Sequence, residues 1–182
     1  MLNKKFQQLI SLIVLCFSML TNVSLVQSQS PQIAIAKLAN GSYQFCSEPK
    51  PNDWRDGAGV CLNFIKVGDR IDGYYGYSHS DIFICIRGNS LEDMIVGKAL
   101  GLFGSDMESS KIPQNKVQWD IEHRLALRQG KIIRRIFDRN DHANWVLFQA
   151  ASLNVKGLYQ YQTPQMTPAS KLCDWSIINI PE

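Results

Sequence analysis

The stretch from Gly59 to Phe103 limits most strongly what this chain can fold into. It contains strand-length runs that are rich in β-branched and aromatic residues, and turn residues such as Val67-Gly68-Asp69 bound each run. The runs cover residues 60–64, 71–77, 82–87 and 95–100. Connections this short join antiparallel neighbours, because a parallel crossover needs a dozen or more residues. The stretch therefore predicts an antiparallel β-meander.

Successive side chains of a strand face opposite ways, so the runs predict an inside and an outside. The predicted inner face consists of Val60, Leu62, Phe64, Ile71, Gly73, Tyr75, Tyr77, Ile82, Ile84 and Ile86. Cys46, Cys61 and Cys85 fall on the opposite face. Gly73 and Gly97 point inward without a side chain. Such glycines mark either curvature of the sheet or space for a ligand, and both interpretations stay open here.

The first 28 residues are expected to be a secretory signal peptide. Lys4 and Lys5 precede an apolar run over residues 9–20, and Ser28 ends a stretch suited to signal peptidase. A retained membrane anchor is the alternative, but the run is shorter than the roughly 20 residues of a span. We therefore expect a single β-rich domain over residues 29–182, exported to the periplasm or the extracellular space, with no stable membrane span after cleavage.

The charge of the predicted mature chain is close to balanced. The whole sequence has 19 basic and 16 acidic residues, and the first 28 residues hold two of the basic ones, which leaves 17 against 16. This balance gives no sign of a nucleic-acid partner or an acidic substrate.

Four cysteines follow the predicted signal peptide, and an even set in an exported chain indicates two disulfides. Cys46 and Cys61 face outward at the same end of consecutive strands, which favours their pairing. A bond from Cys61 to Cys85 would have to span about twice the ~4.8 Å strand spacing. Cys85 is then left to pair with Cys173. Four free thiols or a metal site are the alternatives, but the spacings contain no Cys-x-x-Cys, so we expect no metal.

The rest of the chain predicts further strands. Residues 41–46 form a first strand and residues 104–116 a loop, and a long half-buried strand over residues 117–128 is predicted to end at Gln129-Gly130. Its inward face would hold Val117, Trp119, Ile121, His123, Leu125 and Leu127, with Asp120 facing outward. Residues 131–137 and 145–155 suit either helix or strand, and residues 157–161 look like a last strand. The pattern predicts an all-β fold whose meander closes into a barrel, with a two-layer sandwich as runner-up and room for one short helix.

Four motifs carry a resemblance to known proteins. They are Gly41-x-Tyr43, Gly59-Val60-Cys61, Gly73-Tyr74-Tyr75 and the run from Ser80 to Gly88. With these motifs, residues 41–101 resemble a group of small exported bacterial proteins, chiefly from photosynthetic bacteria. The resemblance implies export and a β-rich fold and implies no activity. The opening Gly-x-aromatic strand and the meander are also similar to lipocalin-type barrels, in which Trp usually stands where this chain has Tyr43.

Four inward side chains are the candidate ligand-binding residues: Tyr75, Tyr77, Trp119 and His123. The aromatic rings could stack on a small apolar or aromatic molecule, and His123 would add a polar group to the cavity wall. The competing interpretation is an ordinary hydrophobic core that holds a hydrogen-bonded histidine. We name no cofactor, because phosphate-binding glycine motifs are absent from the sequence.

His79-Ser80-Asp81 has the residue types of a hydrolase triad, but triad members converge from separate chain segments. Gly-x-Ser-x-Gly is also absent. We therefore predict a turn in which Ser80 or Asp81 bonds nearby backbone N–H groups, and we name no catalytic residue. A secreted hydrolase stays an alternative to the leading hypothesis, which is a non-enzymatic exported protein that binds a small ligand.

The sequence has one basic cluster: Arg128, Lys131, Arg134, Arg135 and Arg139. It is either a solvated face or a surface that meets an anionic polymer or lipid headgroup in the cell envelope. An envelope protein that acts through surface contacts, made by the Arg128–Arg139 region or by the Glu48–Gly59 loop, is the other alternative function.

Overall fold

A computed structural model describes residues 34–53, 56–104, 112–137 and 142–179 of the chain. Met1–Pro31 and Gln32–Glu182 are separate units, and every element described below belongs to the second. The predicted signal peptide lies outside the described residues. In the described part the strands form one antiparallel sheet in the order β6-β7-β8-β5-β4-β3-β2-β1-β9.

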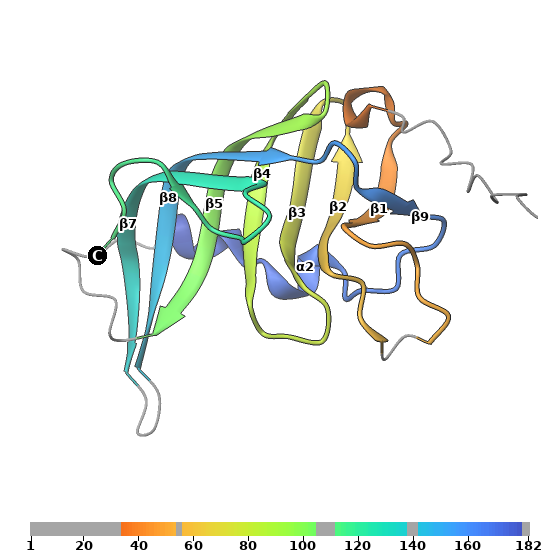
Figure 1. Ribbon diagram of the computed structural model, residues 1–182. Helices are drawn as coiled ribbons and strands as arrows, with labels where there is room; N and C mark the ends of the chain where they lie inside the picture. The colour runs from red at the N-terminus through yellow and green to blue at the C-terminus, as the bar shows by residue number, and fades with distance from the viewer. Residues whose placement is uncertain (1–33, 54–55, 105–111, 138–141, 180–182) are drawn as a thin grey trace, which may run out of the picture. The chain divides into compact units, whose positions relative to one another are not determined.

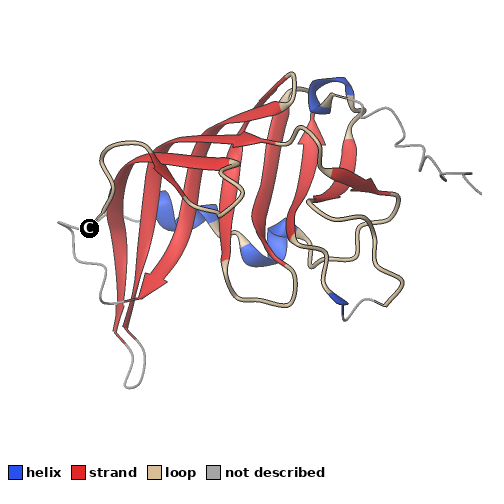
Figure 2. Cartoon of the chain, in the orientation of Figure 1, coloured by secondary structure: helices blue, strands red, loops and turns tan. Residues whose placement is uncertain are grey.

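The strands are β1 (Gly41–Cys46), β2 (Val60–Val67), β3 (Arg70–Tyr77), β4 (Phe83–Leu91), β5 (Met94–Gly104), β6 (Val117–Gln118), β7 (Leu125–Phe137), β8 (His142–Asn154) and β9 (Tyr159–Tyr161). The helical turns are short: η1 (Ile35–Lys37), α2 (Ala169–Leu172) and η4 (Trp175–Asn179). Figure 2 shows how little of the described chain is helical. Residues 131–137 and 145–155 suited either helix or strand; of these, residues 131–137 and 145–154 are strand in the β7–β8 hairpin.

The sheet curls into a half-barrel (Figure 1), so the predicted all-β fold with barrel-like curvature is confirmed. The β1–β5 part is the predicted meander, in which each strand pairs with the next. Two glycines let adjacent strands approach closely where the sheet curls. A Cβ atom on Gly73 would lie only 2.5 Å from the Asn63 carbonyl oxygen, and a Cβ atom on Gly97 would lie 2.2 Å from the Arg87 carbonyl oxygen. These two glycines therefore serve the packing of neighbouring strands.

The concave face of the sheet holds the main hydrophobic core. Its sheet residues include Phe45, Val60, Leu62, Phe64, Ile71, Tyr75, Ile84, Ile86, Ile95, Leu125, Leu127, Val146, Phe148 and Leu153. Each large side chain buried in this way contributes about 1.5–3 kcal/mol to stability. The predicted inner positions are confirmed for Ile84 and Ile86. The prediction for Ile82 is wrong, because Ile82 precedes β4 and is 61% exposed.

Residues 162–179, which we call the C-terminal arm, cover part of the opposite, outer face. A second cluster joins Tyr74, Cys85, Leu100 and Leu147 of the sheet to Ala169, Cys173, Trp175 and Ile177 of the arm. The Arg87 guanidinium lies 4.6 Å from the centre of the Trp175 ring, a cation–π contact. Figure 1 shows α2 lying against the sheet. Both faces of the central strands are therefore buried.

Both predicted cysteine pairings are confirmed. Cys46 and Cys61 stand opposite each other in the β1–β2 ladder with their Cα atoms 4.0 Å apart. Cys85 is bonded to Cys173 at a Cα separation of 5.7 Å and links β4 to the C-terminal arm. The first bond spans 15 residues and the second 88. In the chain-entropy model, such loops contribute about 3 and about 4–5 kcal/mol respectively.

The predicted single strand over residues 117–128 is wrong. The chain reverses in the middle of this run, so that Val117 of β6 pairs with Leu127 of β7. The buried Asp120 side chain accepts hydrogen bonds from the backbone N–H of Arg124 and of Leu125, and His123 has a φ of 56°. The carboxylate thus fixes a tight turn that an alternating hydrophobic pattern does not reveal.

The predicted strand end at Gln129-Gly130 is also wrong, because β7 continues to Phe137. Gln129 has a φ of 55°, and its N–H and that of Gly130 bond to the carbonyls of Gln114 and Pro113. These bonds let a local irregularity sit inside a continuous strand.

Within the described residues, no helix is long and apolar enough to span a membrane.

Candidate functional site

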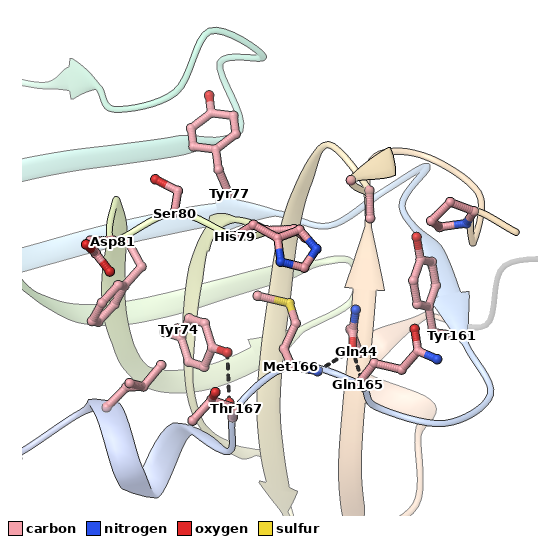
Figure 3. A pocket seen from close by; sticks show the side chains of 16 residues that line it. Gln44, Tyr74, Tyr77, His79, Ser80, Asp81, Tyr161, Gln165, Met166 and Thr167 are labelled. Atoms are coloured by element: carbon pink, nitrogen blue, oxygen red, sulfur yellow. Dashed lines mark hydrogen bonds between the residues drawn. The ribbon is translucent and has the colours of Figure 1, made fainter. Parts of the chain in front are cut away.

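A cleft of about 750 Å³ lies on the outer face of the sheet, beside the C-terminal arm. It is bordered by the arm, the turn between β3 and β4, and the loop that contains Pro51 and Ala58 (Figure 3). Its lining residues are Gln44, Pro51, Gly57, Ala58, Tyr74, Tyr77, Ser78, His79, Ser80, Asp81, Phe83, Tyr161, Gln165, Met166, Thr167 and Leu172.

Buried polar side chains of β1, β2 and β3 hold the arm in place along the cleft. The Gln44 Oε1 accepts hydrogen bonds from the backbone N–H of Gln165 at 2.7 Å and of Met166 at 3.2 Å. The Asn63 amide donates to the carbonyls of Met166 and Thr167, and the Tyr74 hydroxyl donates to the Thr167 carbonyl at 2.7 Å. Burial raises the pKa of Tyr74, which keeps this hydroxyl a donor. Because unpaired buried groups are costly, these contacts fix the position of the arm.

Apolar side chains form one wall of the cleft. The rings of Tyr74 and Phe83 meet edge to face with their centres 5.5 Å apart. Met166 packs against the cluster around Cys85 and against a smaller outer-face cluster of Cys46, Ala58, Cys61 and Tyr161. Leu172 packs against the cluster around Cys85. Aromatic rings with a flexible thioether form a surface that suits a flat, apolar molecule.

The predicted His79-Ser80-Asp81 turn forms part of the cleft rim. His79 has a φ of 58°, and the Ser80 hydroxyl accepts the backbone N–H of Ile82 at 3.0 Å, which is the predicted turn hydrogen bond. In Figure 3 the His79 ring points across the cleft toward Met166, whereas Ser80 and Asp81 point in other directions. The three side chains supply a polar rim and do not converge as a triad would.

The structure brings together three of the four predicted ligand residues. Trp119 lies against Tyr75 and Tyr77, with ring centres 5.9 and 6.2 Å apart, on the concave face. Tyr75 is fully buried there. His123 does not join them, because it lies exposed in the β6–β7 turn instead of facing inward as expected. Tyr77 also borders the outer cleft, but its ring points away from the other labelled side chains. The ligand role of these four residues stays a prediction.

Sequence reasoning missed Asp120, whose carboxylate also accepts a hydrogen bond from the Tyr75 hydroxyl, with the two oxygens 3.2 Å apart. The alternation placed it on the outer face, whereas it is only 4% exposed. The signal available in the sequence is the spacing: the aspartate stands four and five residues before the residues whose backbone N–H groups donate hydrogen bonds to it. The sequence carried no comparable signal for Gln44 and Asn63, because their partners are 121 and 103 residues away.

Comparison with protein-family models, with curated proteins and with solved structures gives no significant match. No group of three or more histidine, cysteine or acidic side chains within the described part is arranged to hold a metal ion. The candidate site therefore stands on its geometry alone.

Replacing Asp120 with Ala should lower the free energy of unfolding by about 2–4 kcal/mol, because two backbone N–H groups and the Tyr75 hydroxyl lose their buried acceptor. Urea unfolding measures the loss. Glu122→Ala is the matched control: Glu122 pairs with Arg124 at a partly exposed position, and its loss should cost less than about 1 kcal/mol. Equal losses in the two variants would contradict the role given to Asp120.

Stability should fall as the pH rises above about 10, where tyrosines of the unfolded chain ionise. Burial, and then the Asp120 and Glu122 carboxylates, raise the pKa of Tyr75 in the folded protein. As the pH rises, Tyr75 therefore loses its hydroxyl proton in the unfolded state before it does so in the folded state. Its contribution to stability is complete below the pKa of the unfolded chain and is lost progressively above that pKa. Urea unfolding between pH 8 and 12 should show a shallower decline for Tyr75→Phe than for the unaltered protein. Parallel curves would show that Tyr75 does not contribute.

Proposed function

We propose that this protein is an exported binding protein that holds a small apolar or aromatic molecule in the outer-face cleft. The observation that carries the proposal is the wall formed by Tyr74, Phe83 and Met166 beside a polar rim. A volume of about 750 Å³ falls within the roughly 300–1,000 Å³ typical of small-molecule sites. The site takes up a flat apolar group and orients it through a few polar contacts.

Polar side chains border the cleft at its rim. The acceptor oxygen of Gln44 and the hydroxyl proton of Tyr74 already serve the arm. His79 points across the cleft and Asp81 is exposed at its edge. A ligand with an apolar body and one or two polar substituents matches this distribution.

Disulfides on two sides of the cleft support binding without a large rearrangement. Cys46–Cys61 packs with Ala58 and Tyr161 at one end, and Cys85–Cys173 packs with Tyr74 at the other. A site fixed in advance loses little conformational entropy when a ligand enters. Two disulfides are also consistent with an oxidising compartment, and we propose the periplasm or the extracellular space.

The cleft is a better candidate than the concave face that the sequence favoured. On that face Tyr75 is fully buried against Trp119 and Asp120. The outer cleft is open and bordered by three separate chain segments. A hydrolase is not favoured, because His79, Ser80 and Asp81 point in different directions.

Phe83→Ala should weaken binding of the neutral aromatic probe N-phenyl-1-naphthylamine by at least about tenfold, since it removes one ring of the apolar wall. A fluorescence titration measures the affinity. Ile82→Ala is the matched control, because Ile82 is the preceding residue, is 61% exposed and does not line the cleft. Its affinity should equal that of the unaltered protein.

Two outcomes would contradict the proposal. One is equal affinity in Phe83→Ala and Ile82→Ala. The other is a loss of probe binding in Trp119→Ala with none in Phe83→Ala, which would place the ligand on the concave face. Native mass spectrometry of protein purified from its own host would then identify any ligand that is retained.

A further inference from the structure

A second groove, of about 510 Å³, lies at the free edge of β7 and is separate from the ligand cleft. It is lined by Ile112, Gln114, Gly130, Lys131, Ile132, Ile133, Arg134 and Arg135. The short strand β6 pairs with β7 at Ala126 and Leu127, and Pro113 and Gln114 accept the N–H groups of Gly130 and Gln129. From Lys131 onward, no described strand pairs with this edge.

The inner part of the groove is apolar and well packed. Ile112 is 5% exposed and lies so close to Gly130 that a Cβ there would meet its Cγ2 at 2.4 Å. Ile132 and Ile133 are half-buried in the groove. The Gln114 amide donates to the Gly130 carbonyl at 2.8 Å, which ties this segment to β7.

The outer part of the groove is cationic. Lys131, Arg134 and Arg135 are exposed, and Arg128 is exposed on the same strand. The described residues of β7 and β8 include no aspartate or glutamate. Hydrogen bonds from Ser176, and to a smaller extent the charge of Arg134, lower the pKa of Asp174 in the C-terminal arm. Arg139 of the predicted basic cluster lies outside the described residues.

Exposed apolar side chains accompany these cations. Phe137, at the end of β7, is 74% exposed, and Leu102 of β5 is 50% exposed. Leu102 pairs with Trp145, which in turn pairs with Arg134, so these residues share one level of the sheet. Figure 1 shows β7 and β8 extending together past the end of β5. Phe137 lies two residues after Arg135 on one face of β7, whereas Leu102 lies level with Arg134 on the other face.

We propose that the groove, together with the exposed Phe137 on the same strand, binds the surface of a membrane that contains anionic lipids. Guanidinium and ammonium groups pair with headgroup phosphates, and the exposed Phe137 enters the boundary between headgroups and acyl chains. Charged side chains at an open strand edge can also serve only to prevent edge pairing between molecules. Apolar residues beside the cations favour the lipid surface, because edge protection does not need them.

The test uses residues 29–182 with both disulfides formed, since all described strands and helices lie within Gln32–Glu182. The probe is vesicles of phosphatidylglycerol and phosphatidylcholine, with pure phosphatidylcholine vesicles for comparison, and flotation measures binding. The double variant Lys131→Gln/Arg134→Gln should bind the anionic vesicles about thirtyfold more weakly, at roughly 1 kcal/mol per cation. The control Arg70→Gln/Lys98→Gln changes exposed residues elsewhere by the same charge and should lose less than about threefold.

Phe137→Ser should also weaken binding, whereas a purely electrostatic contact would not depend on it. Equal binding to the two kinds of vesicle, or equal losses in the two double variants, would overturn the proposal. Binding to a soluble acidic polymer such as polyglutamate without binding to vesicles would overturn it in favour of an acidic macromolecular partner. All variants change exposed positions, and circular dichroism checks that each is folded.

Discussion

The bond between Cys85 and Cys173 joins the middle of the sheet to a segment 88 residues further along the chain. Without that segment, Tyr74, Leu100 and Leu147 would face solvent on the outer side of the sheet. With it, they pack against Trp175 and its neighbours. The bond also fixes where the arm crosses the sheet, because the buried Cys85 gives it one attachment point. The cleft exists beside the arm, so its shape depends on this attachment.

The concave side of the sheet has a different origin. Alternating apolar residues pack on this side, and strand glycines such as Gly73 let neighbouring strands approach each other where the sheet curls. The turn after β6 completes this side, because Asp120 accepts two backbone N–H groups and the Tyr75 hydroxyl. The described residues of the concave face form the buried core, whereas the two grooves described above lie on the outer face and at the β7 edge. The two proposed sites therefore lie on different parts of the molecule and depend on different residues.

Much of the fold could be predicted from the sequence, because side-chain alternation is a local property. It identified the inner positions of β2 and β3, and the outward positions of Cys46, Cys61 and Cys85 were enough to pair the cysteines correctly. Alternation failed where a polar side chain overrides it. Asp120 reverses the chain inside a run that alternates without interruption, and the alternation therefore misplaced His123 and Ile121, which is 84% exposed.

The candidate cleft could not be predicted in the same way. Gln44 and Asn63 read as ordinary strand residues, and their role appears only when the arm returns more than a hundred residues later. The His79 turn was identified from its residue types, and the arrangement of the sheet places it on the rim. Local pattern thus predicts strands and faces, whereas a cleft between distant segments requires the assembled chain.

The central claim is that the bond to Cys85 holds the C-terminal arm against the sheet, and hydrogen exchange tests it most directly. The comparison is between the unaltered protein and Cys85→Ala/Cys173→Ala. Backbone N–H groups of the arm, such as those of Gln165, Met166 and Lys171, should exchange at least about a hundredfold faster in the variant, while those of β2 and β3 change little. Unchanged protection of the arm would show that its hydrogen bonds and packing hold it without the disulfide, and would contradict this account.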